Sequence, residues 1–176
     1  KRLGIIQGWI GGKLTRRGKL QVKKNAEVLQ KENTAHIFSS DLQRAKDTSR
    51  TIAIKTGAKV EFVRNLREIN AGILQGLSFK QAWKKHKDVI LAKRQDKYNY
   101  CPPSGESYKD VKKRLLPFLQ RLTQFKNRTA VVVAHEAINR VLLQILLNLT
   151  DEKTISISHP HECIYIVEKN KGKASV

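Results

Sequence analysis

The segment TAVVVAHEAINRVLLQILL, residues 129–147, decides the fold class. Its first six residues are apolar apart from Thr129, which is typical of a strand covered on both faces. From His135 onward the apolar residues recur at helical spacing, at Ile138, Leu142 and Ile145. A strand that runs directly into a helix indicates a parallel sheet with helices packed against it.

The same alternation continues along the rest of the chain. Short apolar runs predict further strands at Ala35–Phe38, Lys59–Val63 and Cys163–Val167. Helical spacing predicts helices over about 16–31, 42–56 and 79–94, and another after Ser107. Asp41, Ser78 and Ser107 stand where capping residues are expected. We therefore expect an α/β fold, a three-layer α/β/α sandwich with a mainly parallel central sheet, in one domain over residues 1–176.

Composition excludes several classes of protein. The 176 residues are 40% hydrophobic, so the chain is not disordered despite its net charge of +20. No apolar run approaches the roughly 18 residues of a membrane span. Two cysteines are too few for a disulfide scaffold and indicate a reducing compartment, so we expect a cytoplasmic protein. Cys163, within a predicted strand, is expected in the core.

The positive charge predicts an anionic partner. Nucleic acid, a membrane surface and a phosphorylated small molecule all fit, and so does a solvated lysine-rich surface with no specific partner. The densest basic stretch, 80–97, resembles one face of an exposed helix. The chain has no zinc-finger spacing or RNA-recognition signature, and aromatic residues make up only 6% of it. Nucleic acid is therefore an unlikely partner, and we expect no membrane partner.

Ligands of open parallel sheets bind at the carboxyl ends of the strands, and two candidate residues lie there. His135 directly follows the strand at 130–134, although a structural role for a lone histidine stays open. Arg44 lies in the first turn of a predicted helix, where a guanidinium can bind phosphate with two parallel hydrogen bonds. The alternative for Arg44 is a surface salt bridge to Asp41 or Asp47.

Two carboxylates in loops are further candidates. Glu68 precedes a loop that contains Gly72 and Gly76, where a carboxyl group can act as a general acid. Simple pairing of Glu68 with a neighbouring arginine, Arg67 or Arg64, is the alternative. Glu106 stands at a loop-to-helix junction, where it can also simply favour the helix dipole.

Five segments together resemble the histidine phosphatase superfamily, also called phosphoglycerate-mutase-like. They occur in the family's order along nearly the whole chain: IQGWIGGKLTRRG at 6–18, FSSDLQRAKDT at 38–48, LREINAGILQG at 66–76, PSGES at 103–107 and VVVAHEAINR at 131–140. The resemblance implies a phosphoglycerate-mutase-like fold. It also implies transfer of a phosphoryl group to a histidine and then to water, without a metal or another cofactor.

The resemblance also implies roles for individual residues. Arg44 and His135 would be catalytic and would hold the phosphate oxygens, and Glu68 would protonate the leaving group. Further residues would bind or support the substrate: Gln7 and Gly8 at its entrance, Glu106, and the backbone amide of Glu136. Relatives commonly have glycine in place of Glu136, so its carboxylate must point away from a bound phosphate.

The chain departs from the family at its start. The family's nucleophile lies in an Arg-His-Gly triplet, and the nearest substitute here, Arg2-Leu3-Gly4, has leucine in that position. We therefore expect that an N-terminal strand and its Arg-His-Gly segment, roughly 15–20 residues, are missing from this sequence. A natural pseudoenzyme and a deliberate truncation are the alternatives.

The residues after the acid favour hydrolysis over mutase-type transfer. Mutases of the family typically follow it with Arg-His-Tyr-Gly, whereas residues 69–72 are Ile-Asn-Ala-Gly. We expect a phosphatase acting on a small phosphorylated metabolite such as a sugar phosphate, a phosphoglycerate or ribazole phosphate. The lysine-rich region 79–100 indicates a substrate with several negative charges. A mutase, an inactive relative and a basic nucleic-acid-binding module stay as alternatives, and a homodimer is left open.

Overall fold

The computed structural model describes residues 4–125, 129–160, 163–170 and 173–175. Its centre is a parallel sheet in which β1 (Thr34–Ser39) lies between β2 (Lys59–Phe62) and β3 (Thr129–Val133). The register pairs Ile37 with Val60 on one side and with Val131 on the other. The predicted parallel sheet and three of its strands are confirmed.

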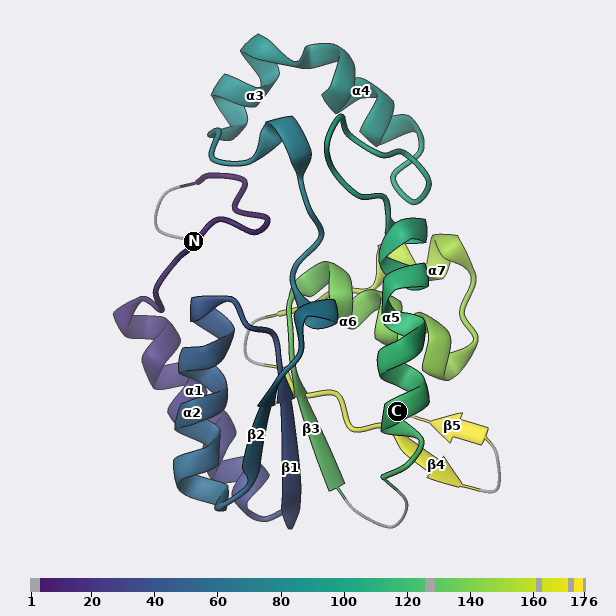
Figure 1. Cartoon of the computed structure of the whole chain (residues 1–176). Coiled ribbons are helices and arrows are strands. Elements are labelled where there is room, and N and C mark those ends of the chain that lie inside the picture. The colour runs from purple at the N-terminus through teal and green to yellow at the C-terminus, as the bar shows by residue number, and fades with distance from the viewer. Residues whose placement is uncertain (1–3, 126–128, 161–162, 171–172, 176) are drawn as a thin grey trace.

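Helices cover both faces of the sheet. On one face lie α1 (Arg16–Gln30) and α2 (Gln43–Thr56), and on the other lie α5 (Tyr108–Leu122) and α6 (Glu136–Leu147) (Figure 1). Successive strand residues point to opposite faces, so Ile37 packs with the first pair of helices and Phe38 with the second. Both side chains are fully buried. The expected three-layer α/β/α sandwich is therefore confirmed.

The region predicted as one helix at 79–94 consists of two helices. They are α3 (Phe79–Lys85) and α4 (Lys87–Gln95), and the chain breaks at His86, whose φ is −141°. The predicted capping box of Ser78 and Gln81 is present at the start of α3. These two helices lie at one end of the molecule, away from the sheet (Figure 1). They pack on their own small core, in which Ala82 and Val89 are buried.

The remaining elements are short. They are the 3₁₀ turns η1 (Arg64–Leu66) and η2 (Gly72–Leu74), the helix α7 (Asp151–Ser156), and the antiparallel strands β4 (Glu168–Asn170) and β5 (Lys173–Ser175). The Ser107 cap is confirmed as a capping box with Asp110 at the start of α5.

Asp41 does not cap α2, contrary to expectation. Leu42 occupies the N-cap position without a side-chain hydrogen bond. The carboxylate of Asp41 instead accepts two hydrogen bonds from Arg67, each 2.6 Å long. A bidentate ion pair with a guanidinium is stronger than a single bond to a backbone amide, so Asp41 joins two loops rather than starting a helix.

One further expectation for a strand is confirmed and another is wrong. β3 is covered on both faces, since Ala130 and Val132 pack with the core on one face and Val131 and Val133 with the core on the other, although only Val133 is almost fully buried. Residues 163–167 form no strand, and Cys163 is exposed rather than in the core. Arg2 and Leu3, which stand where the family's triplet was sought, lie outside the described residues.

Candidate active site

The carboxyl ends of the three parallel strands are joined at one edge of the sheet. Ser40, just past β1, donates its amide to the carbonyl of Val133 at 2.9 Å, and Val63, just past β2, donates to Ser39 at 2.8 Å. The segments that carry His135, Arg44 and Glu68 all leave the sheet from this edge. Parallel pairing therefore brings together residues that lie far apart in the sequence.

His135 is buried at this edge, with 8% of its surface exposed. Its Nε2 lies 2.9 Å from the hydroxyl of Ser40, itself fully buried. Burial, followed by the positive charges of Arg44 and Arg114, lowers the pKa of His135 to about 3. The imidazole is therefore neutral at pH 7. If its Nδ1 carries the proton, the Ser40 hydroxyl donates to Nε2 and leaves Nδ1–H to bind an anion.

Arg44 lies in the first turn of α2, and the N-terminal loop packs over it. Its guanidinium donates to the carbonyl of Gly8 at 2.8 Å and to that of Ile10 at 3.1 Å. These bonds use two of its five N–H donors. Burial lowers the pKa of Arg44, and the nearby charge of Glu68 raises it. Arg44 and Glu68 are thus close enough to interact electrostatically.

The surface salt bridges considered for Arg44 are not formed. Asp41 is bound to Arg67, and Asp47 accepts a hydrogen bond from Gln43 at 2.6 Å. Arg44 therefore forms neither of the two surface ion pairs that were the alternative to anion binding, and its role in anion binding stays a prediction.

The loop at 4–14 is held against the loop that carries Glu68. The amide of Trp9 donates to the side chain of Gln75 at 2.6 Å, and its indole N–H donates to the carbonyl of Glu68 at 2.5 Å. Gly8 has φ +51°, and a Cβ there would lie 2.3 Å from Gln75 Oε1. The positive φ favours glycine there, and any side chain would also have to displace Gln75. Gln7 directly precedes it, with its side-chain amide against Gly12.

Glu106 holds the Glu68 loop in place. Its two carboxylate oxygens accept hydrogen bonds from Arg114 Nε at 2.8 Å and Nη2 at 2.9 Å, and from the amide of Asn70 at 2.9 Å. Arg114 also donates to the backbone carbonyls of Asn65 and Arg67. These contacts join the turn that carries Glu106 to the loop that carries Glu68.

Glu136 begins α6 directly after His135. Its side chain is paired with Arg140 at 2.9 Å, one helical turn further on. Arg140 also donates to the carbonyl of Ile157 at 2.9 Å and to the hydroxyl of Tyr108 at 3.2 Å. The carboxylate is thus paired one helical turn along α6, while the backbone amide lies in the first turn, where an anion is favoured. That the carboxylate points away from a bound phosphate stays a prediction.

Two lysines of the α3–α4 region face this group. Burial, then the charge of Lys97, lowers the pKa of Lys93, while the charge of Glu68 raises it. Burial, then the charge of Arg140, lowers the pKa of Lys97, while the charge of Glu136 raises it. Lys93, Lys97 and Arg140 therefore form a chain of neighbouring cations beside Glu68.

Sequence reasoning did not single out several residues of this site. They are Ser40, Tyr108, Arg114, Arg140, and the individual lysines Lys93 and Lys97. The motifs at 38–48 and 131–140 contain Ser40 and Arg140 without assigning them a role, and the lysine-rich composition of 79–100 pointed toward the two lysines without saying which lysine faces a neighbouring loop.

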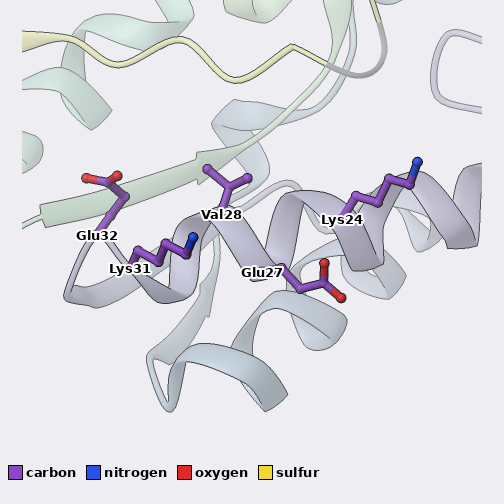
Figure 2. Close-up of a pocket in the computed structure, with 5 residues that line it drawn as sticks. All are labelled: Lys24, Glu27, Val28, Lys31 and Glu32. Carbon is purple, nitrogen blue, oxygen red and sulfur yellow. The ribbon is translucent and has the colours of Figure 1, made fainter.

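A depression of about 460 Å³ lies elsewhere, along α1 (Figure 2). Its lining residues are Lys24, Glu27, Val28, Lys31 and Glu32. Four of them follow at the spacing of one helix face, so this is the outer surface of one helix rather than a cleft between elements.

Over the residues that the structure covers, no three His, Cys, Asp or Glu side chains are grouped so that they could hold a metal ion. Over the same residues, no helix is long and apolar enough to cross a membrane.

Comparison with known proteins agrees with this fold. A solved mycobacterial glucosyl-3-phosphoglycerate phosphatase is 31% identical, with a TM-score of 0.81 over 90% of this chain and 78% of that one. The α-ribazole phosphatase of Shigella flexneri superposes with a TM-score of 0.88 over 98% of this chain and 86% of that one; at 20% identity it shows the fold alone.

Curated relatives at similar identity are longer. The fructose-2,6-bisphosphatase of Saccharomyces cerevisiae is 31% identical over 161 residues, 88% of this chain and 34% of the relative. An Arabidopsis thaliana 6-phosphofructo-2-kinase/fructose-2,6-bisphosphatase is 36% identical over 143 residues, 78% of this chain and 19% of the relative. The chain thus spans about a third or less of the length of these two relatives.

The model of the histidine phosphatase superfamily, branch 1, matches residues 1–176. With a phosphoglycerate-mutase-like fold and this arrangement of residues at the sheet edge, the chain belongs to the histidine phosphatase superfamily.

Proposed function

We propose that the protein is a phosphatase that hydrolyses a phosphate monoester on a small metabolite with a second anionic group. One observation carries the proposal: Arg44, His135 and Glu68 come from three separate segments and interact at the carboxyl edge of one sheet. A fixed cation, a buried neutral imidazole and a carboxyl group are the components that phosphoryl transfer to and from a histidine needs.

In the proposed reaction, Arg44 and His135 bind the phosphate oxygens with the first amides of α6. A histidine nitrogen attacks phosphorus, and the bond from phosphorus to the ester oxygen breaks as Glu68 gives that oxygen its proton. The Glu68 carboxylate then takes a proton from water, whose oxygen attacks phosphorus and releases phosphate from the histidine. Two easier steps thus replace one difficult step. No metal is assigned a part in either step.

We further propose that the attacking histidine belongs to an Arg-His-Gly segment outside these 176 residues. The edge of β3 supports this: among the described strands it pairs only with β1, although its sequence is the most apolar of the sheet. Edge strands are usually blunted by charges or proline, and β3 has neither. Another strand would fit beside it.

The cations beside Glu68 support a second anionic group on the substrate. Lys93, Lys97 and Arg140 bring three positive charges close to two carboxylates, Glu68 and Glu136, so an added anion would be favoured among them. The Tyr108 hydroxyl lies with them, at 3.2 Å from Arg140. Among the substrates that the relatives' names give, fructose 2,6-bisphosphate and glucosyl-3-phosphoglycerate both carry two acidic groups, so they are the first to test.

The test of the reaction is hydrolysis of p-nitrophenyl phosphate by the full-length protein in the presence of EDTA. His135→Ala should lower the rate at least about 10²-fold, the usual loss on removing one preorganised donor from a developing negative charge. Arg44→Lys should lower it as well, whereas Arg50→Lys, on the exposed part of the same helix, is the matched control. Activity that needs a metal, or a fully active His135→Ala variant, would contradict the proposal.

Trapping the phosphorylated protein locates the nucleophile. We expect an acid-labile phosphoryl group on a histidine of the full-length protein, and none on a chain restricted to residues 1–176. Label on such a restricted chain would place the nucleophile within it, and a full-length protein that is never labelled would favour an inactive relative.

A further inference from the structure

We propose that the outer surface of α3 and α4 binds membranes with anionic lipids. This docking surface consists of three apolar residues, Phe79, Trp83 and Leu91, and of the lysines and the arginine that lie among them. The proposal is independent of the proposed function, because binding to lipid is measured without turnover.

Three large apolar side chains are exposed on these two short helices. Phe79 is 67% exposed, Trp83 40% and Leu91 42%. Phe79 and Trp83 are four residues apart and share one face of α3. Contiguous exposed apolar side chains with a polar border are typical of interaction sites.

The ring of Trp83 connects the two helices into one surface. Lys87 Nζ lies 5.8 Å and the guanidinium of Arg94 lies 5.2 Å from the ring centroid. On α4, Leu91 lies between these two cations at helical spacing, so it belongs to the same face. Exposed apolar groups and cations therefore alternate across both helices.

Charge favours an anionic partner for the docking surface. From Phe79 to Gln95 the chain carries six lysines and arginines against one carboxylate, Asp88. Lys93 faces the Glu68 loop, as described above, whereas Lys80, Lys84 and Lys85 are exposed. Apolar tips that enter the acyl boundary while lysines meet anionic headgroups are the usual features of helices bound at the membrane interface.

The position of the two helices also suits a flat partner. α3 and α4 lie at the end of the molecule farthest from the body of the sheet (Figure 1). They are supported from behind by a separate core containing Ala71, Leu74, Ala82 and Val89. Nucleic acid would bind the cations, but its phosphate backbone would leave the apolar side chains of Leu91 and Phe79 exposed to water. A lipid interface accommodates both kinds of side chain, so it fits better.

Co-sedimentation of the full-length protein with vesicles tests the proposal. We expect binding to phosphatidylcholine vesicles that contain phosphatidylserine, and binding at least about tenfold weaker to phosphatidylcholine alone, given a gain of about fivefold for each lysine near an anionic surface. Raising the salt from about 0.1 M to 1 M should release the protein, because the Debye length falls to about 3 Å.

Two double variants of the docking surface are compared with two matched double variants on α1. The comparison distinguishes binding by this surface from attraction of the whole basic protein to anionic lipids. Phe79→Ser/Trp83→Ser and Lys80→Glu/Lys84→Glu should each weaken binding about tenfold or more. α1 also exposes two apolar residues among lysines, with Leu20 56% and Val28 48% exposed. The control variants Leu20→Ser/Val28→Ser and Lys24→Glu/Lys31→Glu should bind like the unmodified protein.

Fluorescence gives a measurement that needs no destabilising variant. Trp83 should shift to shorter wavelength when anionic vesicles are added, and Trp83→Phe should abolish the shift although Trp9, the other tryptophan, remains. Equal binding to neutral vesicles, equal losses in the α1 variants, or binding to duplex DNA without binding to vesicles would overturn the proposal.

Discussion

Arg114 and the pair Lys93–Lys97 both bring positive charge to the loop that carries Glu68, but they differ in how fully that charge is paired with carboxylates. Arg114 is matched by the bidentate carboxylate of Glu106 and by backbone carbonyls. Lys93 and Lys97 are half-buried beside each other and beside Arg140, their charges only partly matched by Glu68 and Glu136, and their pKa values are lowered by burial and by the neighbouring cations. An arginine that is fully paired with a carboxylate holds a loop in position. Lysines that outnumber the carboxylates near them instead favour binding of an anion.

The largest expected effect comes from breaking the matched pair. Arg114→Met leaves Glu106, 17% exposed, without its counter-charge and should cost roughly 3–5 kcal/mol of unfolding free energy, measured in urea. Arg121→Met on the same helix is the control, because its partner Glu61 is 36% exposed, and the expected cost is about 0–1 kcal/mol. Equal losses would show that the Glu106 pair is no more than a surface contact.

A nearly equal effect is expected from acid. The unfolded chain protonates its histidines at their ordinary pKa of 6.5, whereas His135 in the folded protein stays neutral until a pKa of about 3. The unfolded state therefore binds more protons in this window, and stability falls as the pH drops from about 6.5 toward 3, by roughly 3–5 kcal/mol at most.

Comparison with His135→Gln isolates this contribution. Asp41 also loses stabilisation in acid, because its pKa is lowered by Arg67, but both proteins share that loss. Unfolding free energies measured from pH 7 to 4 should therefore decrease less steeply in His135→Gln. Parallel curves would mean that His135 is not held neutral by its surroundings.

The contribution of Lys93 and Lys97, whose charges are only partly matched, is tested by comparing two substrates. Lys93→Gln/Lys97→Gln should raise KM for a doubly phosphorylated sugar about 10- to 100-fold, since a hydrogen bond to a charged group is worth roughly 1.5–3 kcal/mol. The loss should exceed that for p-nitrophenyl phosphate by about tenfold, and Lys23→Gln/Lys24→Gln on α1 is the control. Equal losses for both substrates would remove the second anion site.

The smallest expected effect concerns the helix that presents Arg114. Ser107 caps α5 in a box with Asp110, with Oγ accepting the Asp110 amide at 3.1 Å. Ser107→Ala should cost about 1 kcal/mol of unfolding free energy and leave the Glu106 pair in place. A loss as large as that of Arg114→Met would mean that the cap, and not the ion pair, fixes the loop.

Much of the fold follows from local patterns in the sequence. The caps at Ser78 and Ser107 and the end of α2 at Thr56 agree with expectation because their interactions lie within a few residues. The error at Asp41 arose because a distant partner competed with a local one. Asp41 binds Arg67, 26 residues away, and no pattern around Asp41 contains that information.

For the candidate site, too, the sequence predicted individual residues and the structure showed their contacts. The ends of the strands and five ordered motifs predicted Arg44, Glu68 and His135 from the sequence alone. Their catalytic roles, with those of Gln7, Gly8 and Glu136, stay predictions. The supporting role of Glu106 also stays a prediction; only the structure shows that Glu106 contacts Arg114, because two loops must first come together.

By itself, the sequence determined an α/β sandwich and the family, and it predicted which strand ends carry the chemistry, since periodicity, caps and ordered motifs are local properties of the chain. Tertiary structure alone decided which charges are matched and which are not. Whether an arginine or lysine meets a carboxylate, a carbonyl or another cation depends on contacts between distant segments, and burial then sets the energy of each contact.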